Sequence, residues 1–164
     1  MGFGTLIATI VVVACLILAM HLFVAGGCFM GEALSRAVMD YAELEGERAR
    51  TKIEISDVSV SAADINATVN NTGEEKIREF SKMDVIVTYY SSQGREVRWL
   101  PYTRSVPPAN DTWTVVGISP DEMNPGILDP GEALSVWIRL SSPPEGGWLV
   151  VVTPNGVGAS SYFG

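Results

Sequence analysis

The chain lacks most of the side chains on which enzyme active sites depend. Its 164 residues include one histidine and two cysteines. All three, Cys15, His21 and Cys28, fall within the first 31 residues. The rest of the chain therefore offers no Ser-His or Cys-His nucleophile pair and no common zinc site. The glycine-rich stretches also lack the lysine and the strand-to-helix setting of a phosphate loop. We expect no enzymatic activity, no catalytic residue and no cofactor.

Charge is missing from the beginning of the chain. No Asp, Glu, Lys or Arg precedes Glu32, and residues 5–29 read TLIATIVVVACLILAMHLFVAGGCF. About 20 apolar residues are enough to cross a bilayer as a helix. Residues 1–31 are therefore predicted to form a transmembrane helix. The side chains expected to anchor it or to pack against other helices are Leu6, Ile10, Val13, Ile17 and Phe23.

This apolar segment differs from a cleaved secretory signal, which has a basic first region, a shorter apolar core and a small-residue cleavage motif. We therefore expect an uncleaved anchor. His21 is a candidate functional group because a bilayer penalises its charge; the alternative is a neutral imidazole near a neighbouring helix or the headgroups. Cys15 and Cys28 are too far apart in sequence for a short metal or redox motif, and both are expected to act as small hydrophobes.

Basic residues are scarce throughout. The chain has 11 Lys and Arg against 19 Asp and Glu, a net charge of −8, which argues against nucleic acid as a partner. The few positive charges that follow the apolar segment would weakly place the rest of the chain inside the cell. Three Asn-x-Ser/Thr sequons, in loop-like or strand-edge contexts, favour an exported surface instead. The possible N-glycosylation sites are Asn66, Asn70 and Asn110.

Residues 32–50 combine charge with an apolar period typical of a helix. Leu34, Val38, Tyr41 and Leu44 recur at steps of three or four residues, which predicts an amphipathic helical stalk. Arg36 and Asp40 are spaced to meet across one turn. Such a stalk would pack against copies of itself or brace a globular head. A solvated linker helix without a partner is the alternative.

From residue 51 the hydrophobic period changes from helical to alternating. The first alternating residues are Ile53 and Ile55, then Val58 and Val60. A change of phase near Asp57 predicts a β-bulge. About eight short strands, separated by Gly and Pro and without a second helical stretch, predict an antiparallel β-sandwich or Greek-key barrel over residues 51–164. The fold class is therefore α+β, a helix and stalk followed by an all-β domain.

Four tryptophans fall in the predicted strands. In residues 133–140, ALSVWIRL, the alternation directs one set inward: Leu134, Val136, Ile138 and Leu140. Ser135, Trp137 and Arg139 face outward. An outward tryptophan could mark a contact surface, or it could cover a neighbouring strand. We expect most of the four to be partly buried: Trp99, Trp113, Trp137 and Trp148.

Carboxylates are the remaining candidates for chemistry. Four lie close in sequence: Asp121, Glu122, Asp129 and Glu132. They could supply oxygen ligands to calcium, but their spacing does not match an EF-hand loop, and no metal is expected. Two Pro-Gly pairs, Pro125-Gly126 and Pro130-Gly131, explain the same stretch as turns. Proline presets φ at the second turn position and glycine accepts a positive φ at the third, so Asp129–Glu132 is predicted to be a type II turn that begins a strand.

Several motifs occur in a fixed order along the chain. GFGTLIATIVV begins the apolar segment, Asn-Thr-Gly occupies 71–73, SPDEMNPGILDPGEAL occupies 119–134 and VVTPNGV occupies 151–157. Together they resemble the archaeal flagellin (archaellin) family, and within it the accessory archaellar protein F. The resemblance spans nearly the whole chain. It implies a type IV pilin-like helix followed by an immunoglobulin-like β-sandwich outside the membrane, in the motility machinery of an archaeon.

The family resemblance allows two roles. A filament subunit normally has a basic leader that is removed, and a nearly uncharged helix that packs in the filament core. This chain begins without such a leader, and its stalk from Glu32 to Lys52 carries five acids and four bases. Charges buried in a filament core would have to be paired, at a cost of several kcal/mol for an unpaired one. Both features favour the accessory protein, unless Met1 is the residue left after leader removal.

The leading expectation is therefore a membrane-anchored accessory or stator protein of the archaellum. Its β-sandwich would bind the surface layer or a sister subunit through a strand edge or loop. The alternative is an archaellin or pilin-like subunit that self-assembles into an extracellular filament through its N-terminal helix. An exported sugar- or calcium-binding module is a third class. The expected partners are the membrane, surface-layer protein or sister archaellum subunits, with a homo-oligomer or filament also open.

Overall fold

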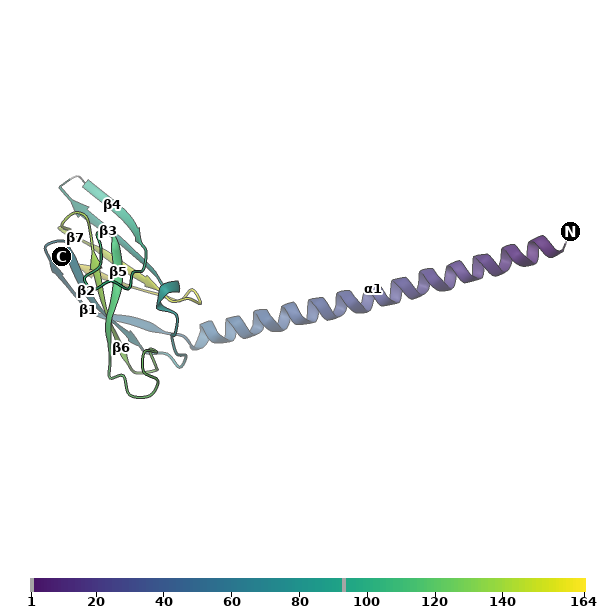
Figure 1. Cartoon of the computed structure of the whole chain (residues 1–164), viewed down its shortest axis with the longest axis horizontal. Coiled ribbons are helices and arrows are strands. Elements are labelled where there is room, and N and C mark those ends of the chain that lie inside the picture. Colours follow the sequence, from purple (N-terminus) through teal and green to yellow (C-terminus); the bar gives the residue numbers. More distant parts are fainter. Residues whose placement is uncertain (1, 93) are drawn as a thin grey trace. The chain divides into compact units, whose positions relative to one another are not determined.

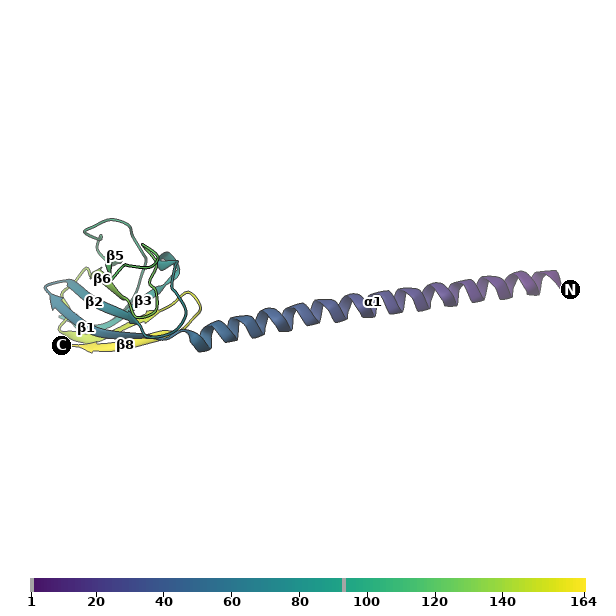
Figure 2. The ribbon, with the colours of Figure 1, turned by 90° about the horizontal axis from the view of Figure 1, so that it is seen from below.

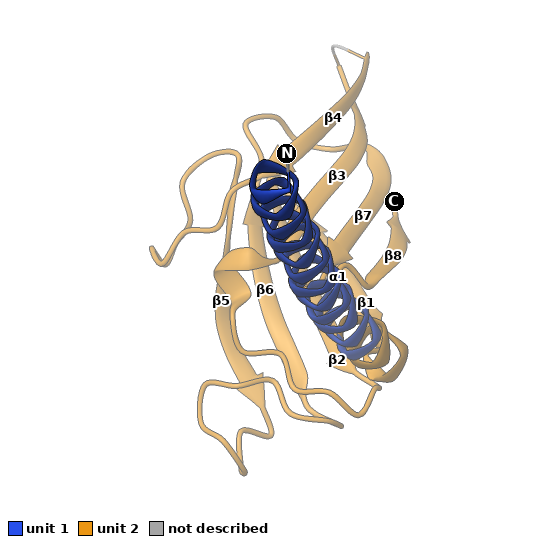
Figure 3. Ribbon diagram, turned by 90° about the vertical axis from the view of Figure 1, so that its right-hand side faces the viewer, with its two compact units in different colours: residues 1–43 blue, residues 44–164 orange. Residues whose placement is uncertain are grey.

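The computed structural model describes residues 2–92 and 94–164. Met1, on whose retention the leader argument depends, lies outside the described residues, as does Gln93. The chain divides into two compact units, Met1–Glu43 and Leu44–Gly164, shown in different colours in Figure 3. The boundary falls inside the expected stalk. The last turns of the helix therefore belong to the same unit as the β-sandwich.

One helix, α1 (Phe3–Arg50), includes the whole apolar segment and the stalk. No proline interrupts it, and the Thr9 hydroxyl donates to the carbonyl of Thr5 at 2.8 Å, so this polar group is satisfied within the helix. An 18-residue window of α1 has a mean hydropathy of 2.8. The helix is thus long and apolar enough to cross a membrane.

Every described side chain in the first unit is exposed. The predicted anchoring residues are among them: Leu6, Ile10, Val13, Ile17 and Phe23. The apolar side chains of the stalk, Leu34, Val38, Tyr41 and Leu44, are exposed as well. The predicted pairing of Arg36 with Asp40 is wrong, because Arg36 pairs instead with Glu32 at 3.8 Å, one turn earlier.

Eight strands form two antiparallel sheets that pack as a β-sandwich (Figure 1). One sheet has the order β1-β2-β6-β5 and the other the order β4-β3-β7-β8. The bounds are β1 Ile53–Ser61, β2 Asp64–Asn71, β3 Asp84–Ser91, β4 Gly94–Leu100, β5 Thr112–Ser119, β6 Ala133–Arg139, β7 Gly146–Val152 and β8 Gly158–Phe163. This is the immunoglobulin arrangement, with β4 as an added strand beside β3. The expected fold class is confirmed.

Alternate residues of both sheets meet in one core. Ile65 and Val69 of β2 are fully buried, as are Leu134 and Ile138 of β6. The inward set predicted for residues 133–140 is therefore confirmed. The predicted bulge is present too, since the register of β1 against β2 shifts between Ile55 and Asp57. β1 and β8 lie side by side (Figure 2) and bring the two sheets together along one side.

The tryptophans are distributed differently from the expectation. Trp113 is fully buried and packs edge-on against Tyr102, with ring centroids 4.9 Å apart. Trp137 is half-buried, with the Arg139 guanidinium 5.3 Å from its ring centroid. Trp99 and Trp148, however, are exposed, so the expectation of mostly half-buried rings is wrong. Strand alternation places both on the outer face of the β4-β3-β7-β8 sheet, where no further layer covers them.

Candidate functional site

The end of α1 is held by two loops of the β-sandwich within the second unit. Arg48 Nε donates to the carbonyl of Asn155 at 2.7 Å, and Arg50 Nε donates to Glu75 Oε1 at 2.7 Å. Both arginines occupy the last helical turn, where positive charge complements the negative end of the helix dipole. We call these loops, residues 72–75 and 153–157, together with the helix end 47–51, the collar.

A chain of polar side chains ties the helix end to the second of these loops. The Thr51 hydroxyl donates to the carbonyl of Glu47 at 2.8 Å and accepts from Asn155 Nδ2 at 2.6 Å. Asn155 Oδ1 in turn lies 2.6 Å from the hydroxyl of Thr153. Thr51 and Thr153 are buried, so each of these bonds satisfies a group that water does not reach. The TPNGV motif thus binds the helix end.

The other collar loop approaches the helix end through its backbone. Glu74 N donates to the carbonyl of Arg50 at 2.8 Å, and Thr72 N donates to that of Lys52 at 2.9 Å. A Cβ on Gly73 would lie 2.4 Å from Lys52 N and 2.5 Å from Arg50 O, distances that backbone atoms cannot accommodate. Glycine is therefore required at position 73 for the loop to cross the chain here.

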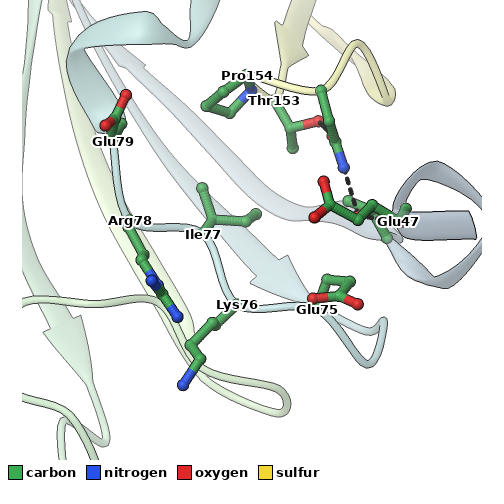
Figure 4. Close-up of a pocket in the computed structure, with 10 residues that line it drawn as sticks. Glu47, Glu75, Lys76, Ile77, Arg78, Glu79, Thr153 and Pro154 are labelled. Atoms are coloured by element: carbon green, nitrogen blue, oxygen red, sulfur yellow. Dashed lines mark hydrogen bonds between the residues drawn. The ribbon is translucent and has the colours of Figure 1, made fainter. Parts of the chain in front are cut away.

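Figure 4 shows a hollow of about 330 Å³ beside the collar. Glu47 contributes to it from the helix end and Thr153 from the second loop, and residues 75–79 line another side. That segment has an acidic residue at each end, Glu75 and Glu79, and two basic residues between them. Its backbone pairs Ile77 with Leu128 through two hydrogen bonds of 3.0 Å. No group of three or more His, Cys, Asp or Glu side chains among the described residues is placed to hold a metal ion. The arrangement is suited to holding the helix end.

The two acids of the Asp129–Glu132 turn are buried and occupied by hydrogen bonds inside the chain. Glu132 Oε2 accepts from Asp129 N at 2.9 Å, and both oxygens of Asp129 accept from Asn124 Nδ2 at 3.0 and 2.9 Å. Gly131 has φ +86°, and Glu132 N donates to the carbonyl of Asp129 at 3.1 Å. These are the positive φ and the closing hydrogen bond of a type II turn.

The second Pro-Gly pair, Pro125-Gly126, forms a comparable turn. Gly126 has φ +84°, and Ile127 N donates to the carbonyl of Asn124 at 2.9 Å. Both carboxylate oxygens of Asp121 accept from Gly126 N at 3.2 Å. Asp121 and Asp129 thus stabilise the backbone and side chains of their own loop.

Asn71 joins the loop that contains the Asp129–Glu132 turn to the collar, a role that the sequence did not reveal. Its side chain is fully buried. Its Nδ2 donates to the carbonyls of Glu75 at 2.7 Å and Leu128 at 3.1 Å, and its Oδ1 accepts from Gly73 N at 3.1 Å. Its backbone N donates to the carbonyl of Glu132 at 2.9 Å. The motifs at 71–73, 119–134 and 153–157 are therefore one connected network around the helix end.

Two of the three sequons do not lie in loops or at a sheet edge. Asn66 and Asn70 belong to β2, which is flanked by β1 and β6. Asn66 is exposed and Asn70 half-buried, both on the outer face of their sheet. Asn110 is exposed in the turn before β5. The expected loop or edge context is thus correct only for Asn110.

Two carboxylates of the sandwich have lowered pKa values. Hydrogen bonds from Arg139 to Asp64, at 2.7 and 3.0 Å across β2 and β6, lower the pKa of the Asp64 carboxyl. Ser91 and then Arg98 do the same for the pKa of Glu96 in β4. Both acids are therefore charged at neutral pH and belong to surface ion pairs, which is not the environment of a catalytic acid or base.

Comparison with known proteins gives one relative over the whole length. No family model matches the sequence. An uncharacterized protein of Archaeoglobus fulgidus is 32% identical over 167 residues, covering 99% of this chain and 96% of the relative.

Solved structures give a fold match. The archaellum periplasmic stator protein FlaG from Sulfolobus acidocaldarius superposes with a TM-score of 0.53 at 24% identity, over 69% of this chain and 99% of that chain. A chain of the FlaF and FlaG stator complex from the same organism gives a TM-score of 0.54 at 24% identity, over 69% of this chain and 89% of that chain. The β-sandwich fold is thus shared with these proteins.

Proposed function

We propose that this chain, which belongs to the same family as the Archaeoglobus fulgidus protein, is a membrane-anchored structural component of the archaellum machinery. The observation that carries the proposal is an apolar helix long enough to span a membrane, joined to a sandwich with the fold of archaellum periplasmic stator proteins. The motif resemblance to the archaellin family supports the same assignment. In this role the sandwich lies outside the cytoplasmic membrane.

The collar supports a structural role in which force passes through the end of α1. A stator must pass force between its head and its membrane anchor without the joint unfolding. Here the bond from Arg48 to Asn155 and that from Arg50 to Glu75 hold the helix end in parallel, at 2.7 Å each. When two bonds share a pulling force, both must break before the end of α1 separates from the sandwich. The two bonds together therefore resist this force more than either bond alone.

We propose that the head binds a sister accessory subunit or the surface layer through the edge of β4. Of the terminal strands, β1 and β5 contain register shifts, and β8 lies beside β1. Bulges discourage pairing with another strand. β4 pairs with β3 in continuous register over seven residue pairs, from Val85–Leu100 to Ser91–Gly94. Its regular register makes β4 the edge best suited to adding a partner strand.

A filament subunit is the second candidate, favoured by the unbroken helix with exposed apolar side chains. Against it stand the nine charged residues of the stalk from Glu32 to Lys52, which would have to be paired inside a filament core. A helix surrounded by solvent between membrane and surface layer has no such requirement.

Cell fractionation separates the two roles. Filaments are sheared from cells that express the chain natively, purified and examined by mass spectrometry together with the membrane and envelope fraction. A stator component is expected in the envelope fraction and absent from the filaments, with an intact N-terminus in terminal sequencing. Recovery as the repeating subunit of the filament, with a processed N-terminus, would assign the chain to the filament instead.

A further inference from the structure

The outer faces of the two sheets differ in chemistry. The β1-β2-β6-β5 sheet presents polar side chains, including Asp64 paired with Arg139 and the sequon residues Asn66 and Asn70. The β4-β3-β7-β8 sheet instead presents exposed apolar and aromatic side chains: Tyr90, Val97, Trp99, Trp148 and Tyr162. Exposed aromatic residues gathered on one face mark a binding surface more often than a solvated one.

Part of this aromatic face is concave. A hollow of about 510 Å³ lies over the beginning of β7, with Gly146 and Gly147 among its lining residues. A Cβ on Gly147 would lie 2.1 Å from the carbonyl oxygen of Thr88, so no larger residue fits there. Gly146 stands opposite Tyr90 in the register of β3 and β7. A Cβ on Gly146 would lie 3.4 Å from the hydroxyl of Tyr162, so the missing side chain leaves space beside Tyr162.

Aromatic rings form the walls of the hollow and hold each other in place. Trp148 and Tyr162 are register partners in β7 and β8, and their rings meet edge to face with centroids 5.6 Å apart and planes at 67°. Trp148 is nevertheless 51% exposed and Tyr162 60% exposed. The rings are therefore ordered by each other while their outer surfaces stay free, which lowers the entropy lost when a ligand binds.

Two charged side chains lie at the rim of the hollow. Arg95 and Glu145 both line the hollow, and across residues 2–92 and 94–164 neither side chain has a hydrogen bond or ion pair within the chain. The backbone of Glu145 does bond, its N donating to the carbonyl of Tyr90 at 2.8 Å, so the residue is anchored while its carboxylate is free. The rim thus offers the guanidinium of Arg95 as a hydrogen-bond donor and the carboxylate of Glu145 as an acceptor, with opposite charges.

We propose that this hollow binds a neutral pyranose unit of a glycan. A pyranose has C–H groups on the faces of its ring, which pack against aromatic rings, and hydroxyls around its edge, which both donate and accept hydrogen bonds. Trp148, Tyr162 and Tyr90 supply the rings, and Arg95 and Glu145 supply the polar partners. Because the rim charges cancel, an uncharged sugar fits better than an anionic one.

Size favours a sugar over a protein partner at this face. The volume lies within the range of about 300–1,000 Å³ typical of small-ligand sites. Four strands of six to eight residues cover roughly 300–400 Å², about half of the ~800 Å² per partner in a stable protein complex. The proposal does not depend on the archaellum role; it requires only that the sandwich face an environment containing glycans.

The test uses the full chain in nanodiscs, because glycoside detergents would compete for the hollow. The probes are the methyl glycosides of glucose, galactose, mannose and N-acetylglucosamine, followed by their disaccharides, with binding measured by saturation-transfer NMR and calorimetry. At least one probe is expected to bind. Trp148→Ala is expected to weaken that binding by about tenfold or more, and Arg95→Gln and Glu145→Gln are expected to weaken it as well.

Trp99→Ala is the matched control. Trp99 lies on the same outer face, is 61% exposed and bonds Asp84 through its indole N at 2.9 Å, but it does not line the hollow. This variant is expected to bind sugar like the parent. Equal losses in Trp148→Ala and Trp99→Ala would overturn the proposal, as would the absence of binding to every probe. A change of oligomeric state in Trp148→Ala without sugar binding would identify the face as a contact between copies and would also overturn it.

A final comparison identifies the source of the glycan. A triple variant, Asn66→Gln with Asn70→Gln and Asn110→Gln, removes all three sequons. The parent chain and this variant are both purified from native cells. Self-association of each is measured with and without free sugar. Loss of such association in the variant assigns the ligand to glycans on neighbouring copies, whereas sugar binding without self-association assigns it to another envelope glycan. In either case Trp148→Ala is expected to stay in the envelope fraction, so failure of the sugar proposal is distinct from failure of the proposed function.

Discussion

Gly73 and Asn71 lie two residues apart and perform different tasks at the collar. Gly73 lets the backbone pass within contact distance of Arg50 and Lys52, where a Cβ would lie 2.5 Å or less from backbone atoms. Asn71 uses both its amide and its carbonyl oxygen inside the protein, and its side chain is fully buried. The conformation of this loop therefore depends on the missing side chain of Gly73 and on the hydrogen bonds made by the side chain of Asn71.

Replacement of Gly73 by alanine is expected to destabilise the sandwich by about 1–3 kcal/mol, because backbone atoms must move to admit the methyl group. Thermal unfolding of the full chain in micelles, followed by near-UV circular dichroism, measures the effect. Gly117→Ala is the control, since a Cβ at Gly117 meets no atom within 4 Å. Equal unfolding temperatures for the two variants would contradict the close approach of this loop to the helix end.

The strands differ in how much of their edge is available. β1 and β5 contain bulges, and β8 lies beside β1. β4, in contrast, has a regular register with β3. The side chains of β4 are mostly exposed, so its identity as a strand depends on pairing with β3 rather than on burial. A regular edge with little burial of its own is suited to pairing with an incoming strand.

Proline substitutions at Val97 and Arg98 test the use of this edge. Backbone N–H groups of successive strand residues point to opposite sides, and proline removes one of them. One of the two variants is expected to lose pairing with β3 and to unfold at a clearly lower temperature. The other should keep the parent's unfolding temperature but lose co-purification with the partner proposed above, a sister subunit or surface-layer protein, from native membranes. If that stable variant still co-purifies, the partner does not pair with β4.

The whole chain divides at Glu43, inside the helix, rather than where the helix ends. The last turns of α1 join the sandwich because their side chains and carbonyls bond the collar loops, while the earlier turns have no buried side chain. The division of 1–31, 32–50 and 51–164 that the sequence suggests therefore stays a prediction about where membrane and solvent meet. The contacts of the folded chain set a different boundary.

Two truncated chains test this boundary. Residues 44–164 are expected to fold as one cooperative domain. Residues 51–164 lack Arg48 and Arg50 and therefore two side-chain hydrogen bonds, each with a net contribution of about 1 kcal/mol. At about 3–6 °C per kcal/mol for a domain of this size, we expect them to unfold about 6–12 °C lower. Arg48→Ala with Arg50→Ala in the longer chain should reproduce part of the loss. Identical unfolding temperatures for the two chains would show that the helix end adds nothing to the domain.

Local sequence was enough to predict the fold class and much of the core. A continuous apolar run of about 20 or more residues crosses a bilayer as a helix. Alternation in β6 identified Leu134 and Val136 as inward residues, because side chains of a strand alternate between its two faces. The turn positions of Gly126 and Gly131 were also predictable from the sequence, and both residues have the positive φ that their turns need.

Contacts between distant segments could not be predicted in this way. The meeting of Asn71, Asn155 and the helix end joins residues separated by up to 107 positions, and no local period encodes such a distance. Burial of Trp113 and exposure of Trp148 likewise depend on which sheet face receives a second layer. The sequence by itself determined an apolar helix and a β-sandwich. Only the tertiary structure decided where the helix becomes part of the head and which face is left open, because both follow from packing between segments that are far apart along the chain.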